Sequence, residues 1–189
     1  MQVFVSPPKI VTGDGCAASL GEQVLALGAK RALIVTDKVL CEKTDCVSGA
    51  VASLTDAGLT AEIFDSVEPD PLVTTAERCA EAARAVSPDV LVGLGGGSSM
   101  DVAKATSAIL GNSVPLSEMW GVDNVPQRGV PLILMPTTSG TGSEVTPNSI
   151  MTDIKPDGSH MKKGIVSPFI LATVAIVDPL LTLTAPPMI

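Results

Sequence analysis

Apolar and polar residues alternate along this chain in blocks that predict strands and helices in turn. Three short apolar runs begin at residues 31, 60 and 89, so each step is 29 residues, a length that suits a strand, a helix and the next strand. A fourth run covers 130–135. The segments around these runs carry apolar residues at helical spacing, and they predict helices over 16–27, 39–57, 71–86 and 99–110. Strands alternating with helices predict an α/β fold, a Rossmann-like parallel sheet flanked by helices.

The pattern changes after about residue 147. Segments 148–153 and 162–167 flank the turn Lys155-Pro156-Asp157-Gly158, which predicts a β-hairpin near 148–167. One more short strand is expected at 174–177.

Composition narrows the protein class. Aromatic residues make up only 2% of the chain, so the core must be aliphatic, as in buried parallel sheets. A net charge of −8 without a basic cluster argues against nucleic acid and anionic membranes as partners. The first residues lack a secretion signal, and the longest uncharged stretch near the end, 164–177, is too short to span a bilayer. These features predict a cytoplasmic protein with neither nucleic acid nor membrane as a partner.

Cysteine and histidine give no metal pattern. The four cysteines lack CxxC spacing, which favours reduced thiols over metal ligands or disulfides. His160 is the only histidine, and we expect it in a loop.

A glycine-rich corner carries the clearest chemistry. Gly95, Gly96, Gly97 and Ser98 directly follow the apolar run 89–94 and precede the helix expected at 99–110. A helix N-terminus after a strand presents backbone N–H groups and partial positive charge to an anion, and glycines let a pyrophosphate come close. Ser98 and Asp101 also have the spacing of a capping box, which would start a helix without any ligand. Three consecutive glycines exceed what a cap requires, so we favour a phosphate site.

Two other strand ends should meet this corner, because parallel strands finish at one edge of the sheet. Asp37 ends the strand that begins at 31. Its carboxylate could accept hydrogen bonds from a ribose and repel a 2′-phosphate, favouring NAD over NADP, or it could cap the next helix. Residues 136–144, after the fourth strand, are rich in Thr, Ser and Gly. They suit a loop lying against a cofactor, or else a flexible polar turn.

Two motifs resemble one known family. Gly-Gly-Gly-Ser-x-x-Asp-x-Ala-Lys (95–104) and Thr-Thr-x-Gly-Thr-Gly-Ser-Glu (137–144) are similar to those of the iron-containing (group III) alcohol dehydrogenases, and segments 34–37, 162–168 and 175–179 add to the match. The resemblance implies a dinucleotide-binding α/β half of an enzyme that transfers hydride between an alcohol or aldehyde and NAD. It also implies a homo-oligomer and a second, all-helical domain that binds Fe²⁺ or Zn²⁺.

Roles for particular residues follow from the resemblance alone. Asp37 would meet the adenosine ribose, and Lys162 the ribose on the nicotinamide side. Asp70 occupies a position where the family often has Asn, near the adenine. The pyrophosphate would be held by Gly95, Gly96, Gly97 and Ser98, with Asp101 nearby. The cofactor cleft would be lined by Thr137, Thr138 and Thr141.

The family's metal ligands are one aspartate and three histidines in the helical half, the first two in an Asp-Ala-Leu-x-His pattern soon after a Pro-Pro pair. The sequence stops at Pro186-Pro187-Met188-Ile189, before that pattern, and Asp178 is not its equivalent. We therefore expect a dinucleotide-binding domain over 1–185, the start of a linker at 186–189, and no catalytic or metal-binding residue in this chain. Weak NAD binding without dehydrogenase activity, and self-association through a domain face left exposed, are expected.

Two alternatives stay open from the sequence. One is a stand-alone nucleotide-binding module without catalysis. The other is a related enzyme, such as a maleylacetate reductase, a glycerol dehydrogenase or a dehydroquinate synthase.

Overall fold

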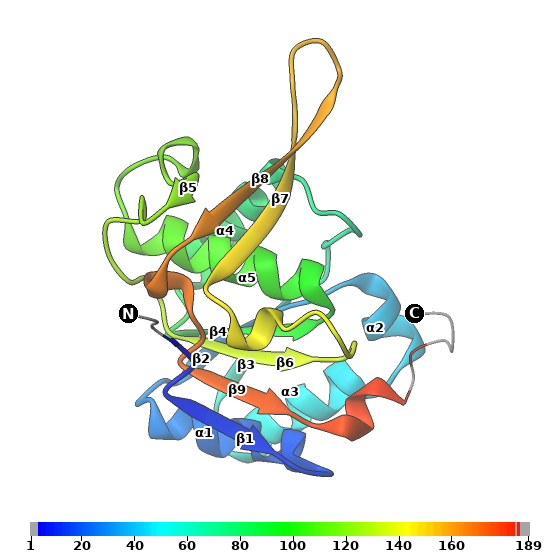
Figure 1. The fold of residues 1–189 in the computed structure, drawn as a ribbon. Coiled ribbons are helices and arrows are strands. Elements are labelled where there is room, and N and C mark those ends of the chain that lie inside the picture. Colours follow the sequence, from blue (N-terminus) through cyan, green and yellow to red (C-terminus); the bar gives the residue numbers. More distant parts are fainter. Residues whose placement is uncertain (1–3, 184, 186–189) are drawn as a thin grey trace.

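A computed structural model describes residues 4–183 and 185, and it confirms the α/β prediction (Figure 1). Six parallel strands form the main sheet in the order β1-β9-β6-β4-β2-β3. The strands are β1 (Lys9–Thr12), β2 (Arg31–Val35), β3 (Thr60–Phe64), β4 (Val90–Gly95), β6 (Leu132–Pro136) and β9 (Val174–Val177).

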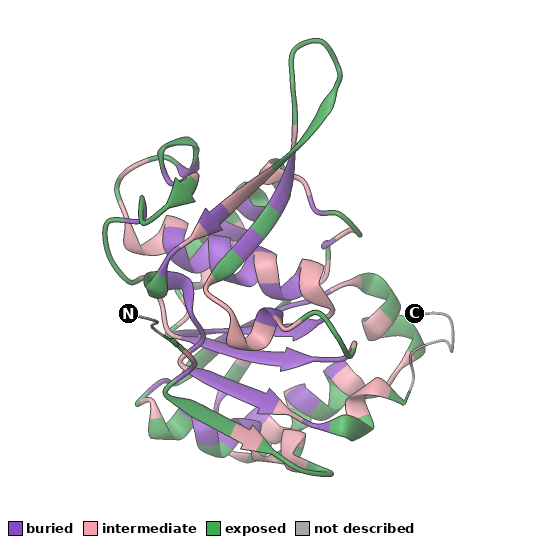
Figure 2. Ribbon diagram, in the orientation of Figure 1, coloured by how far each residue is buried: buried purple, intermediate pink, exposed green. Residues whose placement is uncertain are grey.

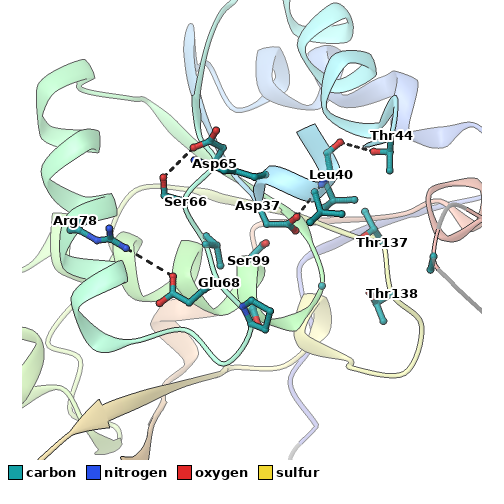
Figure 3. A pocket seen from close by; sticks show the side chains of 17 residues that line it. Asp37, Leu40, Thr44, Asp65, Ser66, Glu68, Arg78, Ser99, Thr137 and Thr138 are labelled. Atoms are coloured by element: carbon teal, nitrogen blue, oxygen red, sulfur yellow. Dashed lines mark hydrogen bonds and ion pairs between the residues drawn. The ribbon is translucent and has the colours of Figure 1, made fainter. Parts of the chain in front are cut away.

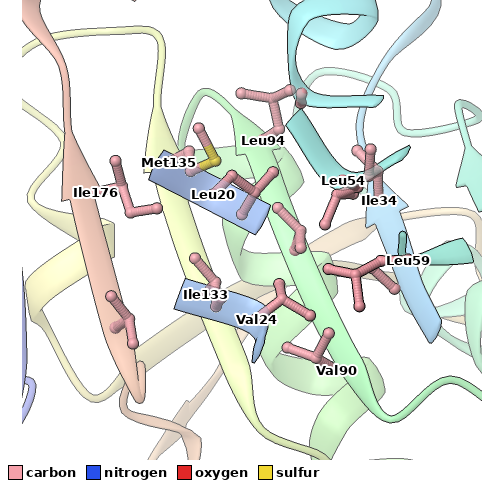
Figure 4. Close-up of a cluster of buried hydrophobic side chains, with 14 of the residues drawn as sticks. Leu20, Val24, Ile34, Leu54, Leu59, Val90, Leu94, Ile133, Met135 and Ile176 are labelled. Atoms are coloured by element: carbon pink, nitrogen blue, oxygen red, sulfur yellow. The ribbon is translucent and has the colours of Figure 1, made fainter. Parts of the chain in front are cut away.

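Helices cover both faces of this sheet (Figure 1). They are α1 (Leu20–Ala26), α2 (Lys38–Lys43) and α3 (Cys46–Asp56) on one face, and α4 (Val73–Val86) and α5 (Gly97–Gly111) on the other. Alternate residues of a strand point to opposite faces, so Ile34 of β2 packs toward α1 and α3, whereas Leu33 and Val35 pack toward α4 and α5. Figure 4 shows Leu20, Val24 and Leu54 of the first helical layer lying against strand residues such as Ile133.

A smaller sheet lies on the outer side of α5. The predicted hairpin forms from β7 (Asn148–Ile154) and β8 (His160–Val166), which are antiparallel, and β5 (Gly121–Val122) pairs with β8. Met151 and Ile165 of the hairpin pack with Ala105 and Ala108 of α5. Helix α5 is thus enclosed between the two sheets, which is why most of it is buried (Figure 2). Short 3-10 turns complete the fold: η1 (Cys16–Ser19), η2 (Leu116–Glu118), η3 (Ser143–Val145), η4 (Pro168–Ile170) and η5 (Pro179–Thr182).

Two glycines allow the C-terminal end of α5 to pack closely against the segment that leads into β6. A Cβ added to Gly111 would lie 2.3 Å from Cα of Gly129, and one added to Gly129 would lie 1.8 Å from the carbonyl oxygen of Ser107. Any side chain at these positions would separate α5 from the segment leading into β6. Backbone packed against backbone therefore fixes this end of the helix.

Several expected element bounds are wrong. The single helix expected over 39–57 is two helices, because Thr44 is extended and its hydroxyl donates to the carbonyl of Leu40 and accepts from the N–H of Cys46. The segment 16–27 starts with a 3-10 turn rather than an α-helix. Helix α4 starts two residues after Pro71, whose carbonyl accepts a hydrogen bond from the N–H of Thr152. His160 is not in a loop but opens β8 opposite Ile154. Strands β1 and β5 were not predicted.

The order of the strands creates a crevice. From β2 the chain passes to β3 on one side, and from β3 it crosses to β4 on the other side of β2. Connections leave β2 and β4 in opposite directions at their carboxyl ends, which is where open parallel sheets bind ligands. The strand ends that carry Asp37 and the glycine corner are those of β2 and β4.

Candidate functional site

A cavity of about 840 Å³ opens at the carboxyl ends of β2, β3, β4 and β6. Its size lies in the range of small-molecule and cofactor sites. Figure 3 shows Glu68 and Arg78 on one side of the cavity and Thr137 and Thr138 on the other. Of the residues proposed from the sequence, those lining the cavity are Asp37, Gly96, Ser98, Thr137 and Thr138.

The glycine corner supplies the start of α5. Gly96 precedes the helix, which begins at Gly97, and no described side chain caps this end. Ser98 lies inside the first turn, so the capping-box interpretation of Ser98 and Asp101 is wrong. The first N–H groups of an α-helix lack partners within the helix, and here they are left free of side-chain caps beside a cavity.

The three glycines differ in how much room the rest of the chain would leave for a side chain at each position. Gly95 has φ +148°, and an added Cβ would lie 2.6 Å from Oγ of Ser99. A Cβ on Gly96 would lie 3.3 Å from Oγ1 of Thr138, which is tight. A Cβ on Gly97 would meet only Thr141, at an ordinary 3.6 Å, among the described residues. Packing within the chain therefore explains Gly95 but gives no reason for Gly97.

Asp37 caps α2 and lines the cavity at once. Its Oδ1 accepts a hydrogen bond from the N–H of Leu40 at 3.0 Å, which confirms the capping interpretation. A carboxylate has a second oxygen that can accept from a ligand. The cap and a ribose contact are thus compatible.

The loop after β6 reaches over the glycine corner. The N–H of Thr137 donates to the carbonyl of Gly95 at 3.0 Å, so the loop leaves the sheet directly beside α5. Thr138 lies beside Gly96 and Thr141 beside Gly97. The predicted cofactor loop and the predicted phosphate corner are therefore in contact.

Asp101 faces away from the cavity. Its carboxylate accepts hydrogen bonds from Oγ of Ser143 at 2.7 Å and from the N–H of Ile150 at 2.9 Å. Next to it, Lys104 is fully buried, and burial lowers the pKa of its ammonium to about 8. Both side chains bind the hairpin and the loop after β6, a use that the sequence did not reveal.

Asp70 and Lys162 form an ion pair at a second cavity of about 480 Å³. This cavity adjoins the first, since Glu68 and Pro69 line both. The positions expected for them, adenine for Asp70 and the nicotinamide-side ribose for Lys162, stay predictions.

Sequence reasoning missed the side of the cavity formed by Glu68 and Arg78. Oε1 of Glu68 accepts from the N–H of Leu72 and from Oγ1 of Thr75. Burial raises the pKa of Glu68, but these hydrogen bonds outweigh that effect and hold it below its usual value. Glu68 thereby ties the loop after β3 to α4. The segment Glu68-Pro69-Asp70-Pro71 was the available signal, whereas nothing local marks Arg78.

No cluster of three or more His, Cys, Asp or Glu side chains suited to a metal occurs within residues 4–183 and 185. Asp178 is buried and accepts hydrogen bonds from the N–H groups of Gly15, Ala17 and Leu180 at 2.9 to 3.0 Å. None of the described helices has the length and apolar character needed to cross a membrane. The expected linker at 186–189 lies outside the described residues.

A family model for iron-containing alcohol dehydrogenase matches residues 7–179. Sulfoacetaldehyde reductase of Bilophila wadsworthia is 37% identical over 187 residues, which are 99% of this chain and 47% of that protein. NAD-dependent methanol dehydrogenase of Bacillus methanolicus is 36% identical over 98% of this chain and 48% of its own length.

Solved structures give the same picture. The crystal structure of a sulfoacetaldehyde reductase from Bifidobacterium kashiwanohense in complex with NAD⁺ has a TM-score of 0.85 at 36% identity, covering 99% of this chain and 48% of that one. A 1,3-propanediol oxidoreductase has a TM-score of 0.92 at 32% identity, covering 98% and 48%. The chain thus spans about half the length of the relatives it matches.

Proposed function

Because this chain belongs to the iron-containing alcohol dehydrogenase family, we propose that it is the NAD-binding half of a metal-dependent alcohol dehydrogenase. In the whole protein, hydride would pass between a small alcohol or aldehyde and NAD. The observation that carries the proposal is the uncapped start of α5 at the sheet's switch point, beside a cavity lined by Gly96 and Ser98, where a Cβ on Gly97 would meet no described atom closer than 3.6 Å.

In this proposal the N–H groups at the start of α5 hold the pyrophosphate, aided by the positive end of the helix dipole. Gly95 and Gly96 form the turn that brings the backbone close, while Gly97 and Ser98 form the first helical positions. Thr137, Thr138 and Thr141 line the adjoining cleft. The free oxygen of Asp37 accepts from the adenosine ribose, and its charge disfavours the 2′-phosphate of NADP. Asp101 does not touch the phosphates but supports the loop above them.

Lys162 would donate to the ribose on the nicotinamide side. The ion pair with Asp70 favours placing Asp70 there too, where its carboxylate orients the Lys162 ammonium. This proposed placement differs from the position near the adenine that the resemblance implies for Asp70.

The remaining parts of the proposal concern the whole protein. Iron or zinc would polarise the substrate oxygen, but the described residues do not fit a metal site, and no step here depends on one. Four free thiols support a cytoplasmic location. A homo-oligomer is also proposed, in keeping with exposed apolar side chains such as Ile10 on the edge strand β1.

Calorimetric titration of the 189-residue chain with ADP-ribose, NAD and adenosine tests the proposal. ADP-ribose and NAD should bind one per chain with similar, weak affinity, because both carry the pyrophosphate. Adenosine lacks it and should bind at least about tenfold more weakly, roughly 1.4 kcal/mol. Equal affinity for adenosine and ADP-ribose, or no binding of ADP-ribose, would refute the assignment of the glycine corner.

A further inference from the structure

Lys104 is a buried cation that joins three parts of the molecule. Its side chain is fully inaccessible, and its Nζ donates to Oγ of Ser143 at 2.9 Å, to the carbonyl of Thr146 at 3.0 Å and to the carbonyl of Asn148 at 2.7 Å. An ammonium has three donors, and all three are used. The Oδ1 atom of Asp101 lies 3.7 Å away. Helix α5, the turn η3 and the start of β7 thus meet at one side chain.

This junction holds the far end of the loop that covers the glycine corner. At its near end the loop is fixed by the hydrogen bond from the N–H of Thr137 to Gly95. The intervening residues 139–141 are exposed, and Gly140 and Gly142 have positive φ. At the far end, Ser143 donates to Asp101 and accepts from Lys104. Lys104 and Asp101 thus attach the loop to α5 at Ser143, just before the chain enters β7.

We propose that Lys104 is a positioning residue for dinucleotide binding, which keeps Thr138 and Thr141 over the start of α5 and offsets the charge of Asp101 behind the phosphate corner. The inference rests on the proposed NAD-binding function. It concerns a side chain that does not line the cavity, and it assigns a purpose to the last residue of the motif 95–104.

The protonation state of Lys104 predicts how the affinity for a dinucleotide depends on pH. Burial lowers the pKa of Lys104 to about 8, although Asp101 on α5 and Glu144 on η3 oppose this shift. A neutral amine has two N–H donors for three acceptors and leaves the charge of Asp101 uncompensated. Affinity for an anionic dinucleotide should therefore fall as pH rises through about 8.

Stability should respond in the opposite direction. Between about pH 8 and the ordinary Lys value of 10.5, the unfolded chain holds a proton on Lys104 that the folded chain has released. Stability contributed by a group rises with pH wherever the unfolded state binds more protons. A loss of affinity in this window therefore cannot come from unfolding driven by Lys104.

Titration of the chain with ADP-ribose at pH 7 and pH 9.5 tests the inference. We expect affinity to fall about tenfold at the higher pH, the result of a one-unit rise in the pKa of Lys104 on binding. Lys104→Met should bind about tenfold more weakly at pH 7, within the usual range of coupling between connected sites, and its affinity should not change with pH. Lys30→Met, an exposed substitution at the amino end of β2, is the matched control and should behave as the parent chain.

The outcomes separate the two proposals. If the parent chain does not bind ADP-ribose at either pH, the proposed function fails. If it binds but Lys104→Met binds equally well, or keeps the pH dependence, the positioning role is wrong. Should Lys104→Met not fold, Ser143→Ala removes one acceptor and leaves the lysine in place. It should lose affinity severalfold at pH 7, and full affinity in Ser143→Ala would overturn the inference.

Discussion

Glycines lie at both ends of helix α5, but the packing around them differs. At the C-terminal end, Gly111 and Gly129 allow two backbone segments to touch, and a Cβ at either would meet main-chain atoms at 2.3 Å or less. At the N-terminal end, a Cβ added to Gly97 would meet only Thr141 carbons among its described neighbours, at an ordinary contact distance of 3.6 Å. One end is closed by the chain itself, whereas the other lies beside a cavity that Gly96 and Ser98 line.

This difference separates a packing requirement from a binding requirement. Where the chain fills the space around a glycine, the missing side chain serves the fold. Where the described chain would accommodate a side chain, the glycine costs conformational entropy without a return in packing. Gly97 is of this second kind, and the proposed pyrophosphate, which would approach the backbone closely, would account for it.

The largest effect is expected at the closed end. Gly129→Ala should destabilise the chain by about 3 kcal/mol, because its Cβ would overlap the carbonyl of Ser107 and force the backbone apart. Urea-induced unfolding measures this change. The folded fraction should still bind ADP-ribose normally, since the substitution is remote from the cavity. A variant as stable as the parent chain would contradict the close approach.

A substitution at the N-terminal end of α5 should change stability in the opposite direction. Gly97→Ala should stabilise the chain by about 0.5 kcal/mol, because the site is compatible with a side chain. It should also weaken ADP-ribose binding about tenfold, roughly 1.4 kcal/mol, because the methyl group occupies the pyrophosphate's approach. Thermal unfolding and calorimetry on one preparation measure both.

Gly49→Ala is the matched control for Gly97→Ala. Gly49 also lies in a helix, α3, and no described atom would lie within 4 Å of its Cβ. This variant should gain stability without losing affinity. If both substitutions leave binding unchanged, the missing side chain at Gly97 has no role in binding.

The smallest effect is expected at the start of α2, which the side chain of Asp37 caps. Asp37→Ser keeps a good N-cap for α2 and removes the charge, so stability should change by less than about 0.5 kcal/mol. The preference for NAD over NADP should fall about fivefold, roughly 1 kcal/mol. Competition titrations with both cofactors measure the ratio.

Asp45→Ser is the control for this charge change. Asp45 precedes α3 and makes no capping bond with its side chain. Its substitution should leave the preference for NAD unchanged. Equal affinities for NAD and NADP in the parent chain would remove the basis for the role of Asp37.

Much of the fold was predictable because its signals are local. The runs at 31, 60 and 89 are strands, and the turn at 155–158 makes a hairpin, since uninterrupted apolar runs and Pro-Asp-Gly turns act over a few residues. The edge strand β1 was missed because its four residues are mostly exposed and carry no buried pattern. The break between α2 and α3 was missed because one hydroxyl of Thr44 outweighs a helical pattern that continues through it.

The candidate site, too, was predictable from the sequence only in part. The sequence by itself determined a strand, a glycine turn and a helix start in immediate succession, and it placed Asp37 at a neighbouring strand end. Only the tertiary structure decided that Asp101 and Lys104 bind residues 39 to 49 positions away rather than a ligand, that Asp70 meets Lys162, and that a Cβ would fit at Gly97 but not at Gly129. The physical reason is range: backbone preference and apolar spacing are properties of adjacent residues. The partner of a buried charge and the room beside a Cα depend on which distant segments the sheet brings together.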